Sequence, residues 1–296
     1  DKKIIKKIIN RRKFSSEKSS HQNFLLKKVF NKKFIKNVNY DGVSINTRTI
    51  KKNNLFFAIK GKNNDGHEFV KKAIEKGAIK SVVSKKIKKL SKNKIIRVED
   101  TFSSLKKLAK VTRDISSAQI IGITGSVGKT TLKNLISFTL KNYGKVYHSP
   151  HSYNNRFGVP LSLSNLKSNI DYGVFEIGMD KKGEIENLSK MVKPEVAVIT
   201  NIAGAHFKNF NTLKDIAKAK AEIINNITKG GNIILNGDDK FFSYLSNKAK
   251  KNEINITSFS RRKKSDIYLM NIKKIKNYFR LKINVKNKIF YFNTKY

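Results

Sequence analysis

The sequence predicts an α/β protein, in which a small N-terminal α/β domain precedes a central domain with a mostly parallel sheet flanked by helices. Its 296 residues suggest two domains. Hydrophobic residues make up 39% of the chain, which is enough for a buried core. Near-continuous apolar segments alternate with helical patterns, as expected for parallel strands covered on both faces. We expect a basic extension at 1–20 and domains at 21–116 and 117–296.

The N-terminal domain is expected to alternate short strands with helices. Apolar runs predict strands at 55–59, 81–83 and 95–98, and the segment 70–78 reads as a helix stopped by Gly77. A longer helix is predicted at about 100–114. Its apolar residues recur every three positions, at Phe102, Leu105, Leu108 and Val111.

The central domain repeats a strand followed by a helix. Strands are predicted at 119–124, 145–149, 172–178, 195–202 and 231–236, and helices at 158–166, 183–191 and 213–227. Another helix begins near Lys129 and ends before Gly144. Its stripe of Leu132, Leu135, Ile136 and Leu140 is typical of an amphipathic helix. Ligands of parallel sheets bind beyond the carboxyl ends of the strands.

The net charge of +43 raises the question of a nucleic-acid partner. Most of the excess lies outside residues 121–240, as lysines scattered among asparagines and isoleucines. Base recognition favours arginine and aromatic side chains, and this chain contains no tryptophan. We therefore interpret the charge as solvated surface and expect no specific nucleic-acid partner, although salt-sensitive polyanion binding is expected of such a surface.

Several classes of protein are excluded or disfavoured. The chain contains no cysteine, which excludes disulfides and thiolate sites and fits a cytoplasmic location. No run of eighteen apolar residues suggests a membrane span, and the N-terminus has no apolar signal core. Because the chain begins with Asp1, we expect it to be a fragment.

The strongest chemical motif is GITGSVGKTT at residues 122–131. An apolar strand enters a glycine-containing turn, and Lys-Thr-Thr then opens a helix. Such a turn lets backbone amides converge on phosphate oxygens at a helix N-terminus. Lys129 would reach the β- and γ-phosphates, and the Thr130 hydroxyl would bind Mg²⁺. The spacing departs from the strict P-loop pattern at Ile123, so we predict a P-loop variant.

Three further residues follow or flank the predicted strands. Glu176 ends a very apolar strand, where a carboxylate needs a cation or a metal, although a solvated strand end is the alternative. His206 follows the strand at 195–202 and is expected at the same sheet edge as Thr130 and Glu176. On the helix at 213–227, Lys218 and Lys220 point about 200° apart, so one of them is expected to face inward.

Six ordered motifs together resemble the Mur ligase family of peptidoglycan synthesis. They are GITGSVGKTT (122–131), YNNRFGVPLSL (153–163), EIGMDKKGEI (176–185), TNIAGAHF (200–207), IAKAKAEI (216–223) and LNGDD (235–239). The segment 44–78 is similar to the family's UDP-binding domain. Within the family, the second and third motifs resemble those of the member that adds D-alanyl-D-alanine to UDP-N-acetylmuramoyl-tripeptide. The likeness covers about residues 40–296.

The resemblance implies the roles of individual residues. It implies Lys129, His206 and Lys220 as catalytic, with Lys220 matching a lysine that is carbamylated in relatives. Mg²⁺ would be held by Thr130 and Glu176, and a second Mg²⁺ by His206. The ATP contacts would be Gly125, Ser126, Val127, Gly128, Lys129, Thr130 and Thr131, with Asn236 and Asp238 near the nucleoside. The substrate contacts would be Thr47, Arg48, Asp65 and His67 for the UDP-sugar, with Asn154 and Asn155 near nucleotide and substrate.

The activity implied is an ATP-dependent amide ligase that works through an acyl phosphate, with ATP and Mg²⁺ as cofactors. Its partners would be UDP-N-acetylmuramoyl-tripeptide and D-alanyl-D-alanine, and the protein is expected to be a monomer. Family members continue with a third, C-terminal domain, which we expect this chain to lack. The alternatives are the sister ligase that adds the third amino acid, a truncated ATP- and UDP-sugar-binding fragment without complete ligase activity, and a nucleic-acid-stimulated P-loop ATPase.

Overall fold

The computed structural model describes residues 18–30, 35, 38–204, 209–261 and 264–295, and its described chain divides into two compact units. The first unit contains residues 1–118 and 144–173, and the second contains residues 119–143 and 174–296. The sequence suggested one boundary, at 116/117. The chain instead passes from the first unit to the second at 118/119, returns at 143/144 and leaves again at 173/174.

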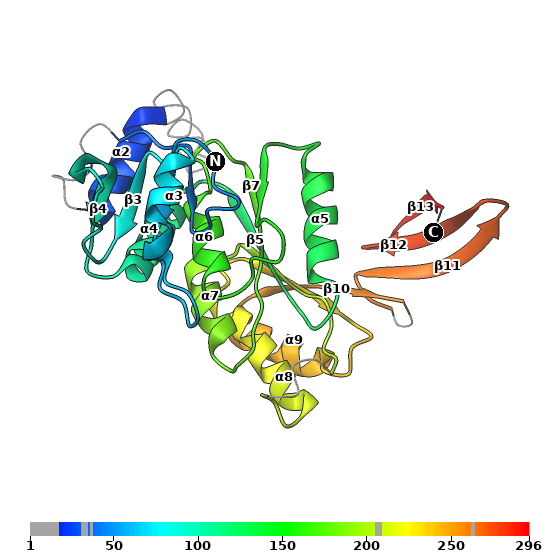
Figure 1. Cartoon of the computed structure of the whole chain (residues 1–296). Helices are drawn as coiled ribbons and strands as arrows, with labels where there is room; N and C mark the ends of the chain where they lie inside the picture. The colour runs from blue at the N-terminus through cyan, green and yellow to red at the C-terminus, as the bar shows by residue number, and fades with distance from the viewer. Residues whose placement is uncertain (1–17, 31–34, 36–37, 205–208, 262–263, 296) are drawn as a thin grey trace, which may run out of the picture. The chain divides into compact units, whose positions relative to one another are not determined.

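The first unit is built on a four-stranded parallel sheet in the order β1-β2-β3-β4, of which Figure 1 labels β3 and β4. The strands are β1 (Gly42–Ser44), β2 (Asn54–Phe57), β3 (Lys80–Val83) and β4 (Ile95–Arg97), with β6 (Val146–His148) also in this unit. The helices are α2 (Lys18–Val29), η2 (Gly66–Phe69), α3 (Val70–Glu75), η3 (Lys92–Lys94), α4 (Thr101–Ile115) and α6 (Gly158–Ser164). The three strands and two helices expected here are confirmed, with ends within a few residues.

Helix α4 organises the core of the first unit. Asp100 caps its N-terminus by accepting a hydrogen bond from the Ser103 amide. The apolar spacing then turns Leu105 and Leu108 inward, and both are fully buried. Helices α2 and α6 pack against α4, so their leucines join the same core. Each such side chain contributes roughly 1.5–3 kcal/mol on burial.

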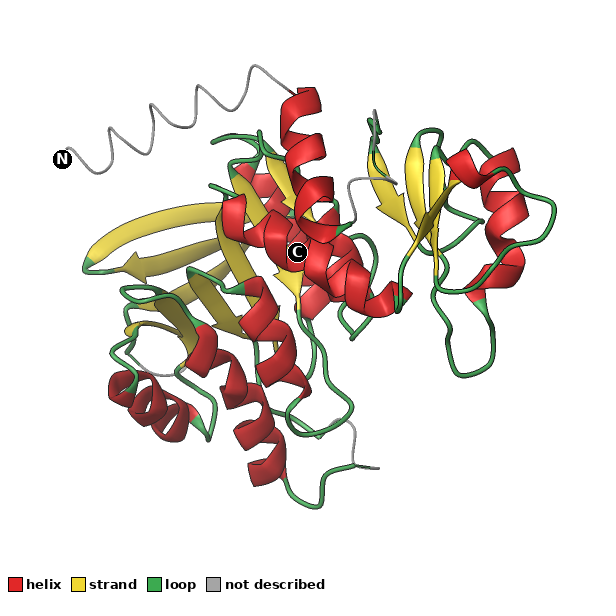
Figure 2. Cartoon of the chain, turned by 90° about the vertical axis from the view of Figure 1, so that its left-hand side faces the viewer, coloured by secondary structure: helices red, strands yellow, loops and turns green. Residues whose placement is uncertain are grey.

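The second unit holds a mostly parallel sheet in the order β13-β12-β11-β10-β9-β8-β5-β7, which confirms the predicted fold class. Its strands are β5 (Gln119–Thr124), β7 (Tyr172–Glu176, entering the unit at Val174), β8 (Val196–Ile199), β9 (Asn232–Asn236), β10 (Asn255–Ser260), β11 (Ile267–Ile275), β12 (Tyr278–Val285) and β13 (Lys288–Thr294). Figure 2 shows strands in yellow and helices in red. The central strands are buried because both of their faces are covered.

Five helical segments accompany this sheet. They are α5 (Lys129–Leu140), α7 (Glu184–Val192), α8 (Leu213–Lys220), η4 (Ala221–Asn226) and α9 (Phe242–Lys251). The single helix expected at 213–227 is thus an α-helix continued by a 3₁₀ segment. Within the described ranges, no helix is long and apolar enough to cross a membrane.

The chain from β11 to β13 forms an antiparallel meander (Figure 1, orange to red). Strands β11 and β12 pair from Ile267↔Val285 to Ile275↔Tyr278, with an irregularity after Leu269. Lysines and asparagines interrupt the apolar alternation here, so periodicity gave no strand prediction after residue 236. Several large apolar side chains of the meander, including Tyr291 and Phe292, are exposed.

Two sequence expectations are wrong in detail. Residues 18–20 belong to α2 rather than to a loose extension, whereas residues 1–17 lie outside the described structure. The leucine stripe of α5 is only partly buried, because Leu132, Ile136 and Leu140 are half-buried and Leu135 is 58% exposed, while Lys133 and Ser137 beside them are buried. The helix lies where the period placed it, and its most deeply buried side chains are two polar residues next to the half-buried apolar ones.

Candidate functional site

The turn between β5 and α5 depends on two glycines. Gly125 has φ +143° and Gly128 has φ +84°, in a region of φ that side chains disfavour. A Cβ added to Gly125 would lie 1.8 Å from the Thr200 hydroxyl, so only glycine fits there. Helix α5 begins directly after Gly128, which has no side chain to cap it. Its first amides therefore lie at an N-terminus suited to an anion.

The segment after β8 holds this turn in shape. The amides of Ser126 and Val127 donate to the backbone oxygen and the side-chain oxygen of Asn201, each at 3.0 Å. The Thr200 hydroxyl donates to the Val127 carbonyl at 2.7 Å. The Ser126 hydroxyl donates to the Ala203 carbonyl and accepts from the Ala203 amide. Sequence reasoning missed Thr200 and Asn201, although the position of their motif at the end of an apolar strand was a usable signal.

Lys129 folds back over the turn that precedes it. Its ammonium group donates to the Gly125 carbonyl at 2.9 Å and to the Ser126 carbonyl at 3.4 Å. Burial lowers the pKa of Lys129, and the Glu176 carboxylate opposes this shift. The positive charge thus lies on the loop that the sequence predicts to receive phosphates.

Glu176 and Thr130 meet although they are far apart in the sequence. Glu176 ends β7 and is 1% exposed. Its Oε2 accepts a hydrogen bond of 2.7 Å from the Thr130 hydroxyl and lies 3.9 Å from the Lys133 ammonium nitrogen. The alternative of a solvated strand-end carboxylate is wrong, because this carboxylate is buried and has polar partners.

The residues present suit a magnesium ion. A hydroxyl and a carboxylate side by side are the hard oxygen donors that Mg²⁺ prefers, and Mg²⁺ commonly binds one or two carboxylates together with phosphates of a substrate. Among the described residues, no group of three or more His, Asp and Glu side chains forms a self-sufficient metal cluster. His206, which was predicted to hold a second Mg²⁺, lies outside the described residues.

Lys220 is the inward-facing lysine of α8. It is 2% exposed, whereas Lys218 is exposed and lies 3.9 Å from Asp215. Burial, and then the charge of Lys129, lower the pKa of Lys220 to about 7. A lysine with this pKa is partly neutral at physiological pH, which is the form that reacts as an amine.

The predicted nucleoside loop follows β9. Asn236 accepts from the Asp238 amide at 3.0 Å, and Asp238 accepts from the Arg261 amide at 2.6 Å. The next residue, Asp239, accepts from the Ile202 amide at 2.7 Å, which ties this loop to the segment that supports the phosphate loop. The shape of the loop is therefore fixed by its own side chains, and its contact with a nucleoside stays a prediction.

The residues predicted to bind the UDP-sugar lie in the first unit. Thr47 is buried, and the Arg48 amide donates to the Asn46 side chain at 2.9 Å. Asp65 accepts from the amide and the ring Nδ1 of His67. The Lys85 ammonium group beside Asp65 holds the pKa of that carboxyl well below its usual range, with the His67 hydrogen bonds adding to the effect.

Both ring nitrogens of His67 form hydrogen bonds. Its Nε2 accepts from the Ser84 amide at 2.9 Å, which assigns the ring proton to Nδ1, facing Asp65. The buried imidazole thus joins the loop at 63–67 to the end of β3. Asp65 and His67 shape this loop, and their contact with a substrate stays a prediction.

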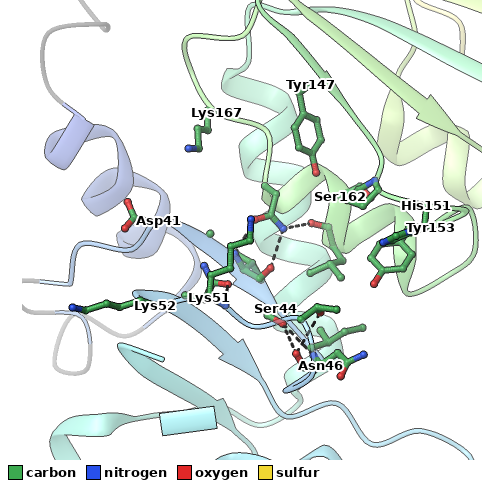
Figure 3. A pocket seen from close by; sticks show the side chains of 18 of the residues that line it. Asp41, Ser44, Asn46, Lys51, Lys52, Tyr147, His151, Tyr153, Ser162 and Lys167 are labelled. Atoms are coloured by element: carbon green, nitrogen blue, oxygen red, sulfur yellow. Dashed lines mark hydrogen bonds between the residues drawn. The ribbon is translucent and has the colours of Figure 1, made fainter. Parts of the chain in front are cut away.

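A cavity of about 870 Å³ also lies in the first unit, beside β1 and α6 (Figure 3). Tyr147, His151 and Tyr153 line one side of it and Lys51, Lys52 and Lys167 the other. Its wall is fixed by Asn165, which exchanges two hydrogen bonds with the backbone of Val43. Sequence reasoning named none of these wall residues.

Asn154 and Asn155, the asparagines predicted from the second motif, directly follow Tyr153 in the sequence, and Tyr153 lines this cavity. The Asn155 side chain accepts from the amides of Phe157 and Gly158 at 3.1 and 2.9 Å, so it caps the start of α6. The Asn154 amide donates to the Ser152 carbonyl. Both belong to the first unit, and their contact with nucleotide or substrate stays a prediction.

Comparisons with known proteins match both halves of the chain to one family. Residues 123–296 match the Mur ligase middle domain, and residues 39–117 match the Mur ligase family catalytic domain. The UDP-N-acetylmuramoyl-tripeptide--D-alanyl-D-alanine ligase of Rickettsia prowazekii is 36% identical over 252 residues, which is 85% of this chain and 56% of that protein. The Bacillus subtilis enzyme of the same name is 37% identical over 67% of this chain and 44% of its own.

Solved structures give the same picture. The crystal structure of MurF from Acinetobacter baumannii aligns with a TM-score of 0.80 at 27% identity, over 93% of this chain and 60% of that one. MurF ligase from Thermotoga maritima, solved in complex with ADP, aligns with a TM-score of 0.74 at 28% identity, over 87% of this chain and 59% of its own. The chain spans about half the length of the curated relatives that it matches.

Proposed function

The chain belongs to the Mur ligase family, and from this premise we propose that it binds ATP and UDP-N-acetylmuramoyl-tripeptide for an ATP-dependent ligation to D-alanyl-D-alanine. The observation that carries the proposal is the contact of 2.7 Å between Thr130 and Glu176, beside a lysine that covers a glycine turn. The relatives named for this reaction, together with the ADP complex of one of them, support the choice of substrates.

The charge of the site supports a polyphosphate ligand. Lys129 and Lys133 both lie close enough to the buried Glu176 carboxylate to feel its charge, and Lys220 in turn feels the charge of Lys129. A triphosphate would supply the negative charge that this arrangement lacks. Thr130 and Glu176 would hold Mg²⁺, whose chemistry when bound is to neutralise charge on the transferring phosphoryl group.

The reaction that we propose has two steps. A carboxylate oxygen of the acceptor peptide attacks the γ-phosphorus of ATP, the bond to the β–γ bridging oxygen breaks, and ADP leaves. Lys129 would stabilise the charge on the phosphoryl oxygens during this step. The amine of D-alanyl-D-alanine then attacks the carbon of the acyl phosphate, loses a proton, and phosphate leaves as the amide forms.

The first unit would hold the UDP-sugar. We assign this role to Thr47, Arg48 and the loop at 63–67; Asn46 and Thr49, on either side of the first two, line the cavity of Figure 3. The lysines on one side of that cavity suit an anionic ligand. We further propose a monomer that works in the cytoplasm, in keeping with a chain that contains no cysteine.

Binding of ADP and of the UDP-sugar by calorimetry tests the proposal. We expect Lys129→Ala to weaken binding of ADP with Mg²⁺ by about a hundredfold or more, because a charged phosphate contact is lost. Binding of UDP-N-acetylmuramoyl-tripeptide should stay unchanged. Lys141→Ala, an exposed lysine just beyond α5, is the matched control. Unchanged ADP binding in Lys129→Ala would overturn the assignment.

Phosphate release separates the reaction from its alternatives. With both nucleotide substrates present, release should depend on D-alanyl-D-alanine rather than on a diamino acid, which distinguishes the sister ligase. Stimulation by DNA or RNA would instead favour a nucleic-acid-dependent ATPase. Binding of both nucleotides without any release of phosphate would indicate a fragment that binds substrates and does not complete the ligation.

A further inference from the structure

Helix α5 buries side chains that its sequence should expose. Lys133 is 1% exposed and Ser137 is also buried, while Phe138 is 72% exposed on the same helix. An amphipathic helix gains stability by burying its leucines, so burial of a lysine instead has a free-energy cost. Such conflicts between local sequence and structure are expected at functional sites.

Lys133 lies on the same face of α5 as Lys129, one turn further on. Its ammonium nitrogen is 3.9 Å from Glu176 Oε2, and both side chains are almost completely buried. The same carboxylate oxygen accepts the hydrogen bond from Thr130. One oxygen of Glu176 therefore faces both a hydroxyl and a cation, which come from consecutive turns of one helix.

The two buried charges depend on each other. A carboxylate in the interior is strongly disfavoured unless a positive charge lies close to it, and the same holds for an ammonium group. Removal of Lys133 would take away a positive charge 3.9 Å from Glu176 Oε2 and leave Lys129 as the other amine whose charge acts on this carboxylate.

We propose that Lys133 is a positioning residue that serves as a buried counter-ion of Glu176 and holds this carboxylate in place before a divalent cation reaches it. The inference rests on the proposed function in one respect, the assignment of Glu176 as a ligand of Mg²⁺. Because both cations act on one carboxylate, Lys133 stabilises the metal-free site and opposes the binding of the metal.

Thermal unfolding of the full chain without nucleotide or substrate tests this role. The variants are Lys133→Met and the exposed control Lys141→Met, each melted with increasing MgCl2 and with NaCl at matched ionic strength. We expect Lys133→Met to melt more than about 5 °C below the natural protein, because Glu176 stays buried after losing a positive charge 3.9 Å away. MgCl2 should restore part of this loss, at a midpoint at least about threefold lower than in the natural protein.

A double variant separates charge from packing. In Lys133→Met with Glu176→Gln, both charges are removed, so the protein should melt above the single variant and respond no more to MgCl2 than to NaCl. If Lys133→Met does not fold and the double variant does, the proposal is supported. It is overturned if Lys133→Met melts like Lys141→Met, if MgCl2 acts on it no more than NaCl, or if the double variant is as unstable as the single one.

This experiment is independent of the ligation reaction. Its readout is the effect of Mg²⁺ alone on melting, whereas the proposed function is tested by ADP binding and phosphate release. If melting responds to Mg²⁺ as expected but the chain binds no ADP, the counter-ion role of Lys133 is supported and the ligase assignment is contradicted. If the chain binds ADP but melting does not respond to Mg²⁺ as expected, the ligase assignment is supported and the counter-ion role of Lys133 is contradicted.

Discussion

Helices α4 and α5 have similar apolar spacing but differ in which side chains are fully buried. Both begin near the carboxyl end of a strand, and both carry leucines at intervals of three or four residues. In α4 the leucines fill the core and the N-terminus is capped by Asp100. In α5 the buried residues are Lys133 and Ser137, and the N-terminus follows Gly128. The period of a sequence predicts that a helix forms, but its buried face depends on what the fold places beside it.

The two N-termini differ for a related reason. The amides at the start of α4 are satisfied within the protein, because the Asp100 carboxylate accepts from Ser103. The start of α5 has glycine in the left-handed region at that position, and a bound anion would take the place of the side-chain cap. The start of α4 is thus capped by a side chain, whereas the start of α5 is not, and the anion that we propose there stays a prediction.

The largest effect expected on the α5 side comes from Gly125→Ala. The new Cβ would lie 1.8 Å from the Thr200 hydroxyl and 3.0 Å from the Thr200 amide nitrogen, so the turn must rearrange. We expect binding of ADP with Mg²⁺, measured by calorimetry, to weaken by about a hundredfold or more. Gly128→Ala is the control, since nothing lies within 4 Å of its added Cβ and only the strain of its φ remains. Equal effects of the two changes would contradict this account.

A direct test of the comparison uses one leucine from each helix. Leu105→Ala in α4 should lower the free energy of unfolding by about 3 kcal/mol, because a fully buried side chain leaves a cavity. Leu135→Ala in α5 should change it by less than about 0.5 kcal/mol, because that side chain is largely in solvent. Urea denaturation measures both. If Leu135→Ala were as costly as Leu105→Ala, the buried face assigned to α5 would be wrong.

Much of the fold could be predicted from the sequence, because its elements follow simple periods. Strand β5 occupies the predicted residues, and α4 is within one residue of its expected ends. The return of residues 144–173 to the first unit could not be predicted, because a local period carries no information about long-range contacts. The meander β11–β13 was missed since lysines and asparagines break its alternation.

The residues of the candidate site could be predicted where they belong to short motifs with a known chemical role. The pairing of Thr130 with Glu176 followed from the rule that ligands gather at the carboxyl ends of parallel strands. Lys133 was overlooked because a lysine inside a helical pattern reads as solvent-facing. Thr200 and Asn201 were overlooked because they act through backbone contacts, which residue type alone does not reveal. His206 lies outside the described residues, so its role stays a prediction.

A smaller effect is expected from pH, because positive charge gathers around the start of α5. The pKa of Lys220 is lowered from 10.5 to about 7, by burial first and by Lys129 second. Between about pH 7 and pH 10 the unfolded chain keeps this proton and the folded chain has released it, so stability rises with pH. Below about pH 7 both states are protonated, and the folded state bears the full cost of the buried charge.

The variant Lys220→Met removes this contribution. Between pH 7 and pH 9, the free energy of unfolding of the natural protein should rise relative to the variant by up to about 2 kcal/mol. Lys218→Met, an exposed neighbour on the same helix, should follow the natural protein. Urea denaturation across this range measures the difference. Parallel pH profiles for the natural protein and Lys220→Met would show that Lys220 titrates as an ordinary lysine.

The smallest expected effect sharpens the comparison at the helix N-termini. Asp100→Ala removes the acceptor for the Ser103 amide at the start of α4 and should cost about 1 kcal/mol of unfolding free energy. The hydrogen bonds from Ser103 lower the pKa of Asp100, so its contribution is present above the usual pKa of an aspartate and is lost as pH falls through the lower folded value. Asp100→Asn keeps the acceptor without the charge, so it should retain most of the stability and lose the acid dependence. If Asn proves as costly as Ala, charge rather than the hydrogen bond secures α4. The contrast with α5 would then narrow, because both helices would depend on an anion at their start.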